Sequence, residues 1–158
     1  MPRTVLLRDW LDRHLARSHT EEELKDGYSL EPASADASFR RYFRVTLPSG
    51  DIRIVMDAPP ELEDCRPFLQ VAALFRDAGV HVPEVFDTDL AQGFLLLSDL
   101  GRETYLDVLN EDNARELMDR ATTALVAWQK ISRPNVLPAY SREVLQRELE
   151  LRIVPIIF

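Results

Sequence analysis

The stretch SFRRYFRVTLPSGDIRIVMDAPP, residues 38–60, decides the fold. On each side of Pro-Ser-Gly at 48–50, apolar side chains alternate with polar ones at a period of two, the pattern of half-buried β-strands. The Pro-Ser-Gly segment supplies a tight turn between the two strands. Pro59-Pro60 ends the second strand, because proline cannot donate a hydrogen bond to a sheet. The stretch therefore predicts an antiparallel hairpin with two basic residues, Arg40 and Arg41, at its opening.

Further elements are predicted on both sides of this hairpin. Leu7, Leu11 and Leu15 recur at helical spacing and predict an amphipathic helix. The full predicted order is a helix at 3–18, strands at 27–35, 38–47 and 51–58, a helix at 64–78, strands at 82–89 and 93–101, and helices at 103–110, 112–132 and 141–152. We therefore predict an α+β fold with a five-stranded, mainly antiparallel sheet. One helix should pack across it, the N-terminal helix should lie beside it, and these side chains should be largely buried: Phe43, Val45, Ile54, Leu95 and Leu97.

Composition excludes several classes of protein. The chain has 158 residues, enough for one domain or one lobe, and 27 acidic against 19 basic residues give a net charge of −8, which argues against a nucleic-acid surface. The one cysteine, Cys65, excludes a disulfide framework and a thiolate metal cluster. No signal peptide and no apolar run of roughly 18–20 residues is present, so no membrane partner is expected. We expect a reduced, cytoplasmic compartment.

Four blocks of the sequence, in order, resemble a known family of kinases. SFRRYFRV, VMDAPPE, GVHVPEVF and GFLLLSDLG are together similar to the bacterial cell-wall amino-sugar kinases, within the aminoglycoside phosphotransferase-like superfamily. Those enzymes phosphorylate N-acetylmuramate and N-acetylglucosamine at the anomeric hydroxyl during peptidoglycan recycling. The resemblance covers about residues 5–152. It implies a kinase-like small lobe at 1–101, the start of a helical large lobe at 102–158, and ATP with Mg²⁺ as cofactors.

The resemblance also implies a set of site residues. The loop before the hairpin should cover the ATP phosphates, where Ser38 offers a hydroxyl donor and Arg40 or Arg41 supplies positive charge. The two arginines lie on opposite faces of a strand, so we expect one of them to point into the cleft. In LLLSDLG, backbone groups from Ser98 to Leu100 should bind adenine. The Asp99 side chain is interpreted as a turn or helix-start carboxylate.

Two features of an active kinase are missing from this sequence. A lysine on the second hairpin strand normally pairs with the phosphates and with a glutamate of the following helix. Neither Lys25 nor Lys130 lies on that strand, and Met56 is interpreted as an apolar filler. The acidic residues before the next helix are expected to be solvated: Glu61, Glu63 and Asp64. No histidine is followed by aspartate two residues later, so we expect a fragment without the catalytic base or the Mg²⁺ ligands.

The residues leave three functions open. In the first, the chain is the ATP-binding portion of an amino-sugar kinase and is inactive by itself. In the second, it is a non-catalytic interaction or regulatory module with a kinase-like lobe. In the third, it is part of a kinase for another acceptor, such as an aminoglycoside or choline. The helices at 112–132 and 141–152 are expected to expose apolar stripes that mediate self-association or pairing with another polypeptide; the stripe residues are Leu117, Leu125, Trp128, Leu145 and Leu149. The alternative is that this segment folds back on the sheet and hides its own stripe.

Overall fold

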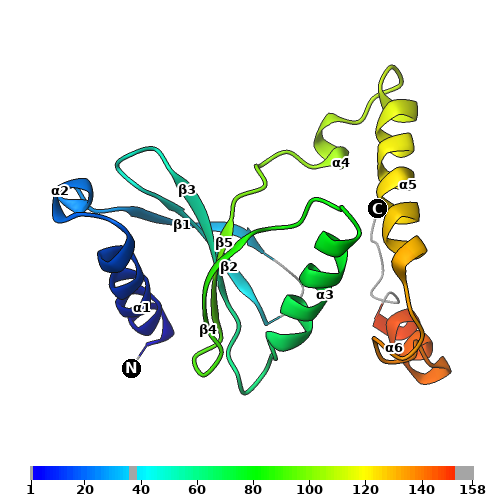
Figure 1. Cartoon of the computed structure of the whole chain (residues 1–158), viewed down its shortest axis with the longest axis horizontal. Helices are drawn as coiled ribbons and strands as arrows, with labels where there is room; N and C mark the ends of the chain where they lie inside the picture. Colours follow the sequence, from blue (N-terminus) through cyan, green and yellow to red (C-terminus); the bar gives the residue numbers. More distant parts are fainter. Residues whose placement is uncertain (1, 36–38, 152–158) are drawn as a thin grey trace.

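The computed structural model describes residues 2–35 and 39–151 (Figure 1). It confirms the predicted α+β fold and the predicted order of elements, with one addition, the single-turn helix α2. The elements are α1 (Arg3–Ser18), α2 (Glu21–Leu24), β1 (Ser29–Ala35), β2 (Arg41–Thr46), β3 (Ile52–Asp57), α3 (Arg66–Asp77), β4 (Val85–Asp89), β5 (Phe94–Ser98), α4 (Tyr105–Val108), α5 (Ala114–Ile131) and α6 (Arg142–Leu151). In the described part of the chain, no helix combines the length and the apolar character needed to cross a membrane.

The five strands form one antiparallel sheet in the order β1-β2-β3-β5-β4. The hairpin of β2 and β3 aligns Arg41 with Asp57 and Thr46 with Ile52, which confirms the predicted antiparallel hairpin. Of the five side chains expected in the core, Val45, Leu95 and Leu97 are buried, whereas Phe43 and Ile54 are half-buried. The sheet thus has the five strands, the antiparallel pairing of the hairpin and the side-chain alternation that the sequence predicts.

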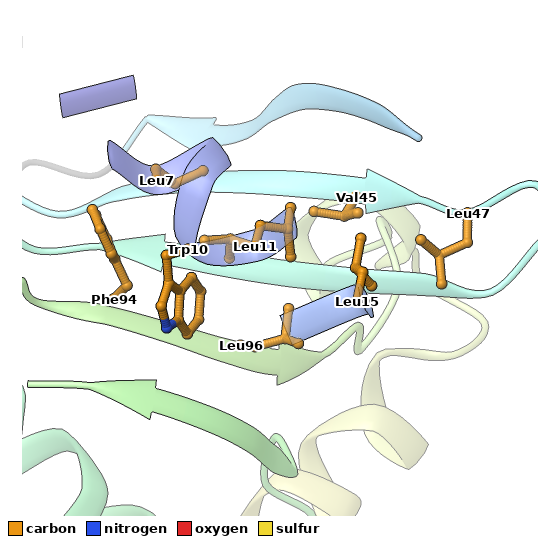
Figure 2. Packing of buried hydrophobic residues seen from close by; sticks show 9 residues of the cluster. Leu7, Trp10, Leu11, Leu15, Val45, Leu47, Phe94 and Leu96 are labelled. Atoms are coloured by element: carbon orange, nitrogen blue, oxygen red, sulfur yellow. The ribbon is translucent and has the colours of Figure 1, made fainter. Parts of the chain in front are cut away.

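Helix α1 covers one face of this sheet and builds the larger apolar cluster. As predicted, this helix lies beside the sheet, and the structure shows that it packs on the face opposite α3 (Figure 1). Figure 2 shows Leu7, Trp10, Leu11 and Leu15 of α1 against side chains of β2 and β5. The Trp10 and Phe94 rings stack with centroids 5.6 Å apart. Aromatic pairs of this kind add about 0.5–1.5 kcal/mol beyond the area they bury, so α1 is an integral part of the core.

Helix α3 covers the opposite face. Phe68 and Leu69 of this helix pack against a second apolar cluster, whose buried members are Met56, Ala58, Cys65, Leu95 and Leu97. Pro67 stands in the first turn of α3, where its missing N–H costs no hydrogen bond. Since β5 contributes buried side chains to both clusters, its continuous run of apolar residues is explained.

The carboxylate of Asp57, at the end of β3, is fully buried between two arginines. Arg3 of α1 donates from Nε at 2.9 Å and from Nη2 at 2.5 Å, and Arg41 of β2 binds the second oxygen through Nε at 3.1 Å and through Nη2. Arg3 also donates to the carbonyl of Gln92 at 2.6 Å and lies over the ring of Phe94. These contacts join α1, the hairpin and the β4–β5 turn at one point.

Helices α5 and α6 lie apart from the sheet, on the far side of α3 (Figure 1). No side chain of α5 is buried. The Trp128 ring contacts the Phe75 ring of α3 at a centroid distance of 5.2 Å, and Gln70 donates to the carbonyl of Val136. Of the expected stripes, Leu117 and Trp128 are therefore half-buried, whereas Leu125 and Leu145 are each 46% exposed and Leu149 is 64% exposed.

Gly93→Ala should destabilise the fold far more than the matched change Gly50→Ala. Both glycines have a positive φ, 73° and 85°, which costs an alanine about 1–2 kcal/mol. A Cβ at Gly93 would also lie 1.8 Å from the carbonyl oxygen of Ala58, whereas nothing lies within 4 Å of a Cβ at Gly50. Denaturant unfolding measures the difference. Equal losses of stability in the two variants would contradict the close approach of the β4–β5 turn to Ala58.

Candidate functional site

A cavity of about 420 Å³ opens where β5 leaves the sheet, on the face covered by α3. Its floor comes from the strands, its back from α3, and its rim from residues 98–104, which we call the linker. The lining residues are Ala33, Tyr42, Arg44, Ile54, Phe68, Pro83, Leu97, Ser98, Asp99, Leu100, Gly101, Arg102 and Thr104. The wall is mainly apolar, with a few polar groups along the rim, which is the usual composition of a small-molecule site.

The structure brings the three predicted linker residues together at this rim. The backbone N–H of Ser98 donates to the carbonyl of Glu84, and its hydroxyl accepts from the Glu84 N–H, both at 2.9 Å, so Ser98 extends the β4–β5 pairing. Asp99 accepts from the N–H of Gly101 at 2.9 Å, which confirms its interpretation as a turn carboxylate. Among the described residues, the backbone N–H and C=O of Leu100 make no hydrogen bond.

The Asp99 carboxylate is also held by Arg44, a residue that the sequence analysis did not assign to the site. Arg44 Nε donates to Oδ2 at 2.8 Å, and Nη2 donates to Oδ1 at 3.1 Å and to the carbonyl of Gly101 at 3.1 Å. Both side chains are largely buried, at 8% and 13% exposed. The Arg44 guanidinium lowers the pKa of Asp99, and Asp99 in turn raises the pKa of Arg44.

A signal for Arg44 does exist in the sequence. Arg44 alternates with Phe43 and Val45, which belong to the α1 face, so it must lie on the α3 face with Tyr42. An arginine in the middle of a strand that is covered on both faces needs a buried acidic partner. The partner, 55 residues further along the chain, could not be identified from the sequence.

The two arginines at the hairpin opening point to opposite faces, as expected. Arg40 lies on the α3 face, 3.4 Å from Glu63 and in contact with Tyr42 of the cavity wall. Arg41 lies on the α1 face, where Asp57 binds it. Ser38 lies outside the described residues. The structure therefore gathers Ser98, Asp99 and Leu100 at one end of the cavity. Arg40 lies beyond the opposite end, past the residues of β2 that line the cavity.

Met56 lies on β3, the strand on which a kinase lysine was expected, and Glu63 precedes α3. Met56 is fully buried in the apolar cluster under α3, as expected of an apolar filler. Glu63 was expected to be solvated, and this was wrong. Its side chain is only 20% exposed because Arg40 lies against it.

Two larger hollows lie beside α5: one of about 740 Å³ between α5 and residues 79–81 that follow α3, and one of about 640 Å³ between the C-terminal part of α3 and residues 128–137. They follow from the sparse contact between these helices, which meet at the Phe75 and Trp128 rings. Neither adjoins the sheet or the linker, so they are gaps between loosely packed elements. Within residues 2–35 and 39–151, no group of three or more His, Cys, Asp or Glu side chains is arranged to hold a metal ion.

One family model and three relatives that match this chain agree with one another. The model of the phosphotransferase enzyme family (APH) matches residues 29–154. Over 148 residues the chain is 55% identical to an N-acetylmuramate/N-acetylglucosamine kinase of Pseudomonas aeruginosa, covering 92% of this chain and 43% of that protein. Proteins with the same name are 47% identical in Pseudomonas putida (90% and 42% covered) and 39% identical in Neisseria meningitidis (96% and 43% covered). The chain thus spans less than half the length of these relatives.

Replacing Asp99 with Asn should remove stability in a pH-dependent way. Because the pKa of Asp99 is lowered in the folded state, its contribution is present above the unfolded value, about 3.9, and is lost as the pH falls through the folded value. At pH 7 we expect the substitution to cost about 1.5–3 kcal/mol, as for a hydrogen bond to a charged group. The difference from the parent should shrink below about pH 4.

Denaturant unfolding between pH 3 and pH 7 measures this effect. Asp64→Asn is the matched control, because Asp64 pairs with Arg66 in an exposed position and should contribute little at any pH. A difference between Asp99→Asn and the parent that stays constant over this range would contradict the buried pair.

Proposed function

The chain belongs to the phosphotransferase enzyme family, and on that premise we propose that it is the ATP-binding portion of a small-molecule kinase. The proposed acceptor is the amino sugar that names its relatives, N-acetylmuramate or N-acetylglucosamine, phosphorylated at the anomeric hydroxyl. The observation that carries the proposal is the cavity between the sheet and the linker, which offers an apolar wall together with the backbone of Leu100.

At the linker end of the cavity, the proposal places the adenine base. Apolar surface from Ile54 and Leu97 would contact its faces, and the N–H and C=O of Leu100 would hydrogen-bond its edge. A purine offers both donors and acceptors on that edge, so one backbone segment satisfies it. The Asp99 carboxylate takes no part in the contact, because Arg44 and Gly101 already bind it.

At the other end, the proposal assigns the phosphates to the hairpin opening, where the family resemblance implied Ser38 and either Arg40 or Arg41. Of these two arginines, Arg40 lies on the cavity face of the sheet, whereas Arg41 is bound to Asp57 on the α1 face. It precedes Arg44 by four residues, or about 14 Å of extended strand, which separates a phosphate end from a base end. An arginine fork suits phosphate oxygens. Arg40 would therefore supply the charge that a lysine provides in other kinases.

The remaining chemistry is assigned to the part of the relatives that this chain does not span. Phosphoryl transfer needs Mg²⁺ to bridge the phosphates and a base to accept the proton of the acceptor hydroxyl. The sequence contains no His-x-Asp triplet to supply that base. On this proposal, residues 1–101 form the nucleotide-binding lobe, residues 102–158 begin the helical lobe, and the complete enzyme works in the cytoplasm, without nucleic-acid or membrane partners.

The exposed apolar side chains of α5 and α6 form the proposed surface for self-association of this chain. Leu125, Leu145 and Leu149 are each at least 46% exposed, and exposed apolar surface that forms a contiguous patch favours an interface. Burial contributes roughly 25 cal/mol per Å², so covering several leucines offsets part of the cost of association.

Sedimentation at micromolar concentration should therefore show dimers of the chain. Leu145→Gln should weaken the association, whereas the control Leu106→Gln should not, because Leu106 lies on α4 and is 87% exposed. A monomer whose Trp128 is shielded from a fluorescence quencher would show that the segment 112–158 covers its own stripe.

Arg40→Ala should remove the preference of the chain for ATP over adenosine. We expect weak binding of both ligands by the parent, with ATP the tighter, and a loss for ATP of about tenfold in the variant, equivalent to ~1.4 kcal/mol. Arg41→Ala is the matched control: it should lower stability, because Asp57 loses a partner, while the preference for ATP remains. Ligand-observed NMR measures both affinities. The reverse pattern would assign the phosphates to Arg41.

The chain alone should transfer no phosphate from ATP to N-acetylmuramate, because positioning and electrostatic stabilisation by the base and the metal supply most of kinase catalysis. Detection of sugar phosphate by mass spectrometry measures this. Robust product formation by residues 1–158 would overturn the assignment of the catalytic groups to the rest of the relatives' length.

A further inference from the structure

We propose that Arg44 is a positioning residue for the purine base, which selects adenine over guanine by fixing the linker backbone. The inference rests on the proposed function and extends it to a residue outside the predicted site. Its basis is one geometric fact: Arg44, on β2, binds the linker at two separate residues, Asp99 and Gly101.

These two contacts enclose Leu100. The Asp99 carboxylate accepts hydrogen bonds from Nε and Nη2 of Arg44, and the Gly101 carbonyl also accepts one from Nη2. Asp99 and Gly101 are also bonded to each other across the turn at 2.9 Å. Leu100 therefore lies between two anchored neighbours, which limits rotation of the peptide groups on either side of it. The direction of its N–H and C=O relative to the cavity is set by this arrangement.

Arginine is the side chain that this arrangement requires. A bidentate pair needs a planar fork with donors fixed in parallel, which the lysine ammonium does not have. The Arg44 side chain is 8% exposed, so water competes little for its donors and the loss of one bond is not readily replaced. The carboxylate also balances the charge of Arg44, so this buried guanidinium brings no unpaired charge to the base end of the cavity. Arg102, which also lines the cavity, is exposed to solvent.

Fixing the backbone has a consequence for base selection. Adenine presents an exocyclic amino donor where guanine presents the O6 acceptor. A rigid linker can pair its N–H and C=O with the donors and acceptors of one base only. With the other base, buried polar groups stay unpaired, and this is how a hydrogen-bonding site rejects a wrong ligand. A linker free to rotate its peptide groups accommodates both patterns. Removal of the Arg44 contacts should therefore weaken adenosine binding and narrow the difference from guanosine.

The test compares adenosine and guanosine binding to the full chain by saturation-transfer NMR, which detects weak complexes. The parent should prefer adenosine. If the linker holds the competent conformation about a tenth of the time without its anchor, adenosine affinity falls about tenfold. Arg44→Lys should show this loss, with an adenosine-to-guanosine ratio near one. Asp99→Asn weakens the same ion pair from its acidic side and should shift the adenosine-to-guanosine ratio in the same direction. This second variant tests the pair even if the Arg44 variant does not fold.

Arg53→Met is the matched control. Arg53 is also a strand arginine paired with an aspartate, Asp51, but it lies over the Phe86 ring on the opposite face of the sheet. The Arg53→Met substitution should leave the affinities for adenosine and for guanosine unchanged.

The outcomes separate this inference from the proposed function. Folded Arg44→Lys and Asp99→Asn variants that keep the affinity and the ratio of the parent would overturn the role of Arg44 and leave the proposed ATP-binding function intact. A parent chain that binds neither nucleoside at millimolar concentration would overturn the proposed function and this inference with it. A loss of affinity for both nucleosides by the same factor would assign Arg44 a structural role only, and would also reject the inference.

Discussion

The buried carboxylate of Asp57 is the constraint on which the other features of this lobe depend. A buried charge that loses its partner costs about 3–5 kcal/mol, so Arg3 must dock α1 on the sheet and Arg41 must lie on the α1 face. Side chains alternate along a strand, and this single placement therefore puts Tyr42 and Arg44 on the other face, where they line the cavity. The same alternation puts Met56, the neighbour of Asp57, in the apolar cluster under α3.

The two faces of the hairpin consequently differ in what they contact. On the α1 face, apolar packing and the Asp57 ion pairs hold the helix to the sheet (Figure 2). On the α3 face, Arg44 holds the linker, and Arg40 and Glu63 pair beyond the far end of the cavity. On our proposal, this second face binds the nucleotide along β2, with the base near Arg44 and the phosphates near Arg40. Positive charge at the phosphate end then comes from the strand before the hairpin turn, in place of a lysine on β3.

The sequence predicts the fold more completely than the site, for a physical reason. Periodicity is local, so the alternation in 38–60 and the leucine spacing of α1 predict the elements, the faces of the strands, and core residues such as Val45, Leu7 and Leu11. Ion pairs across long sequence separations have no local signature. Arg44 and Asp99 are 55 residues apart and Arg3 and Asp57 are 54 apart, and neither pair could be assigned in advance. Glu63 was misinterpreted for the same reason, because its partner Arg40 lies on another element. The linker residues could be placed only through the family resemblance, since backbone groups leave no trace in a sequence.

The central claim is that the cavity between the sheet and the linker, rather than a hollow beside α5, holds the nucleotide. Amide-resolved NMR of the chain, titrated with a non-hydrolysable ATP analogue, tests this most directly. The account predicts that the largest shifts occur at Leu100 and Gly101 of the linker and at Tyr42 of β2, with smaller ones near Arg40. Shifts confined to Gly79, Val80 and the facing residues of α5, or no shifts at millimolar analogue, would contradict it.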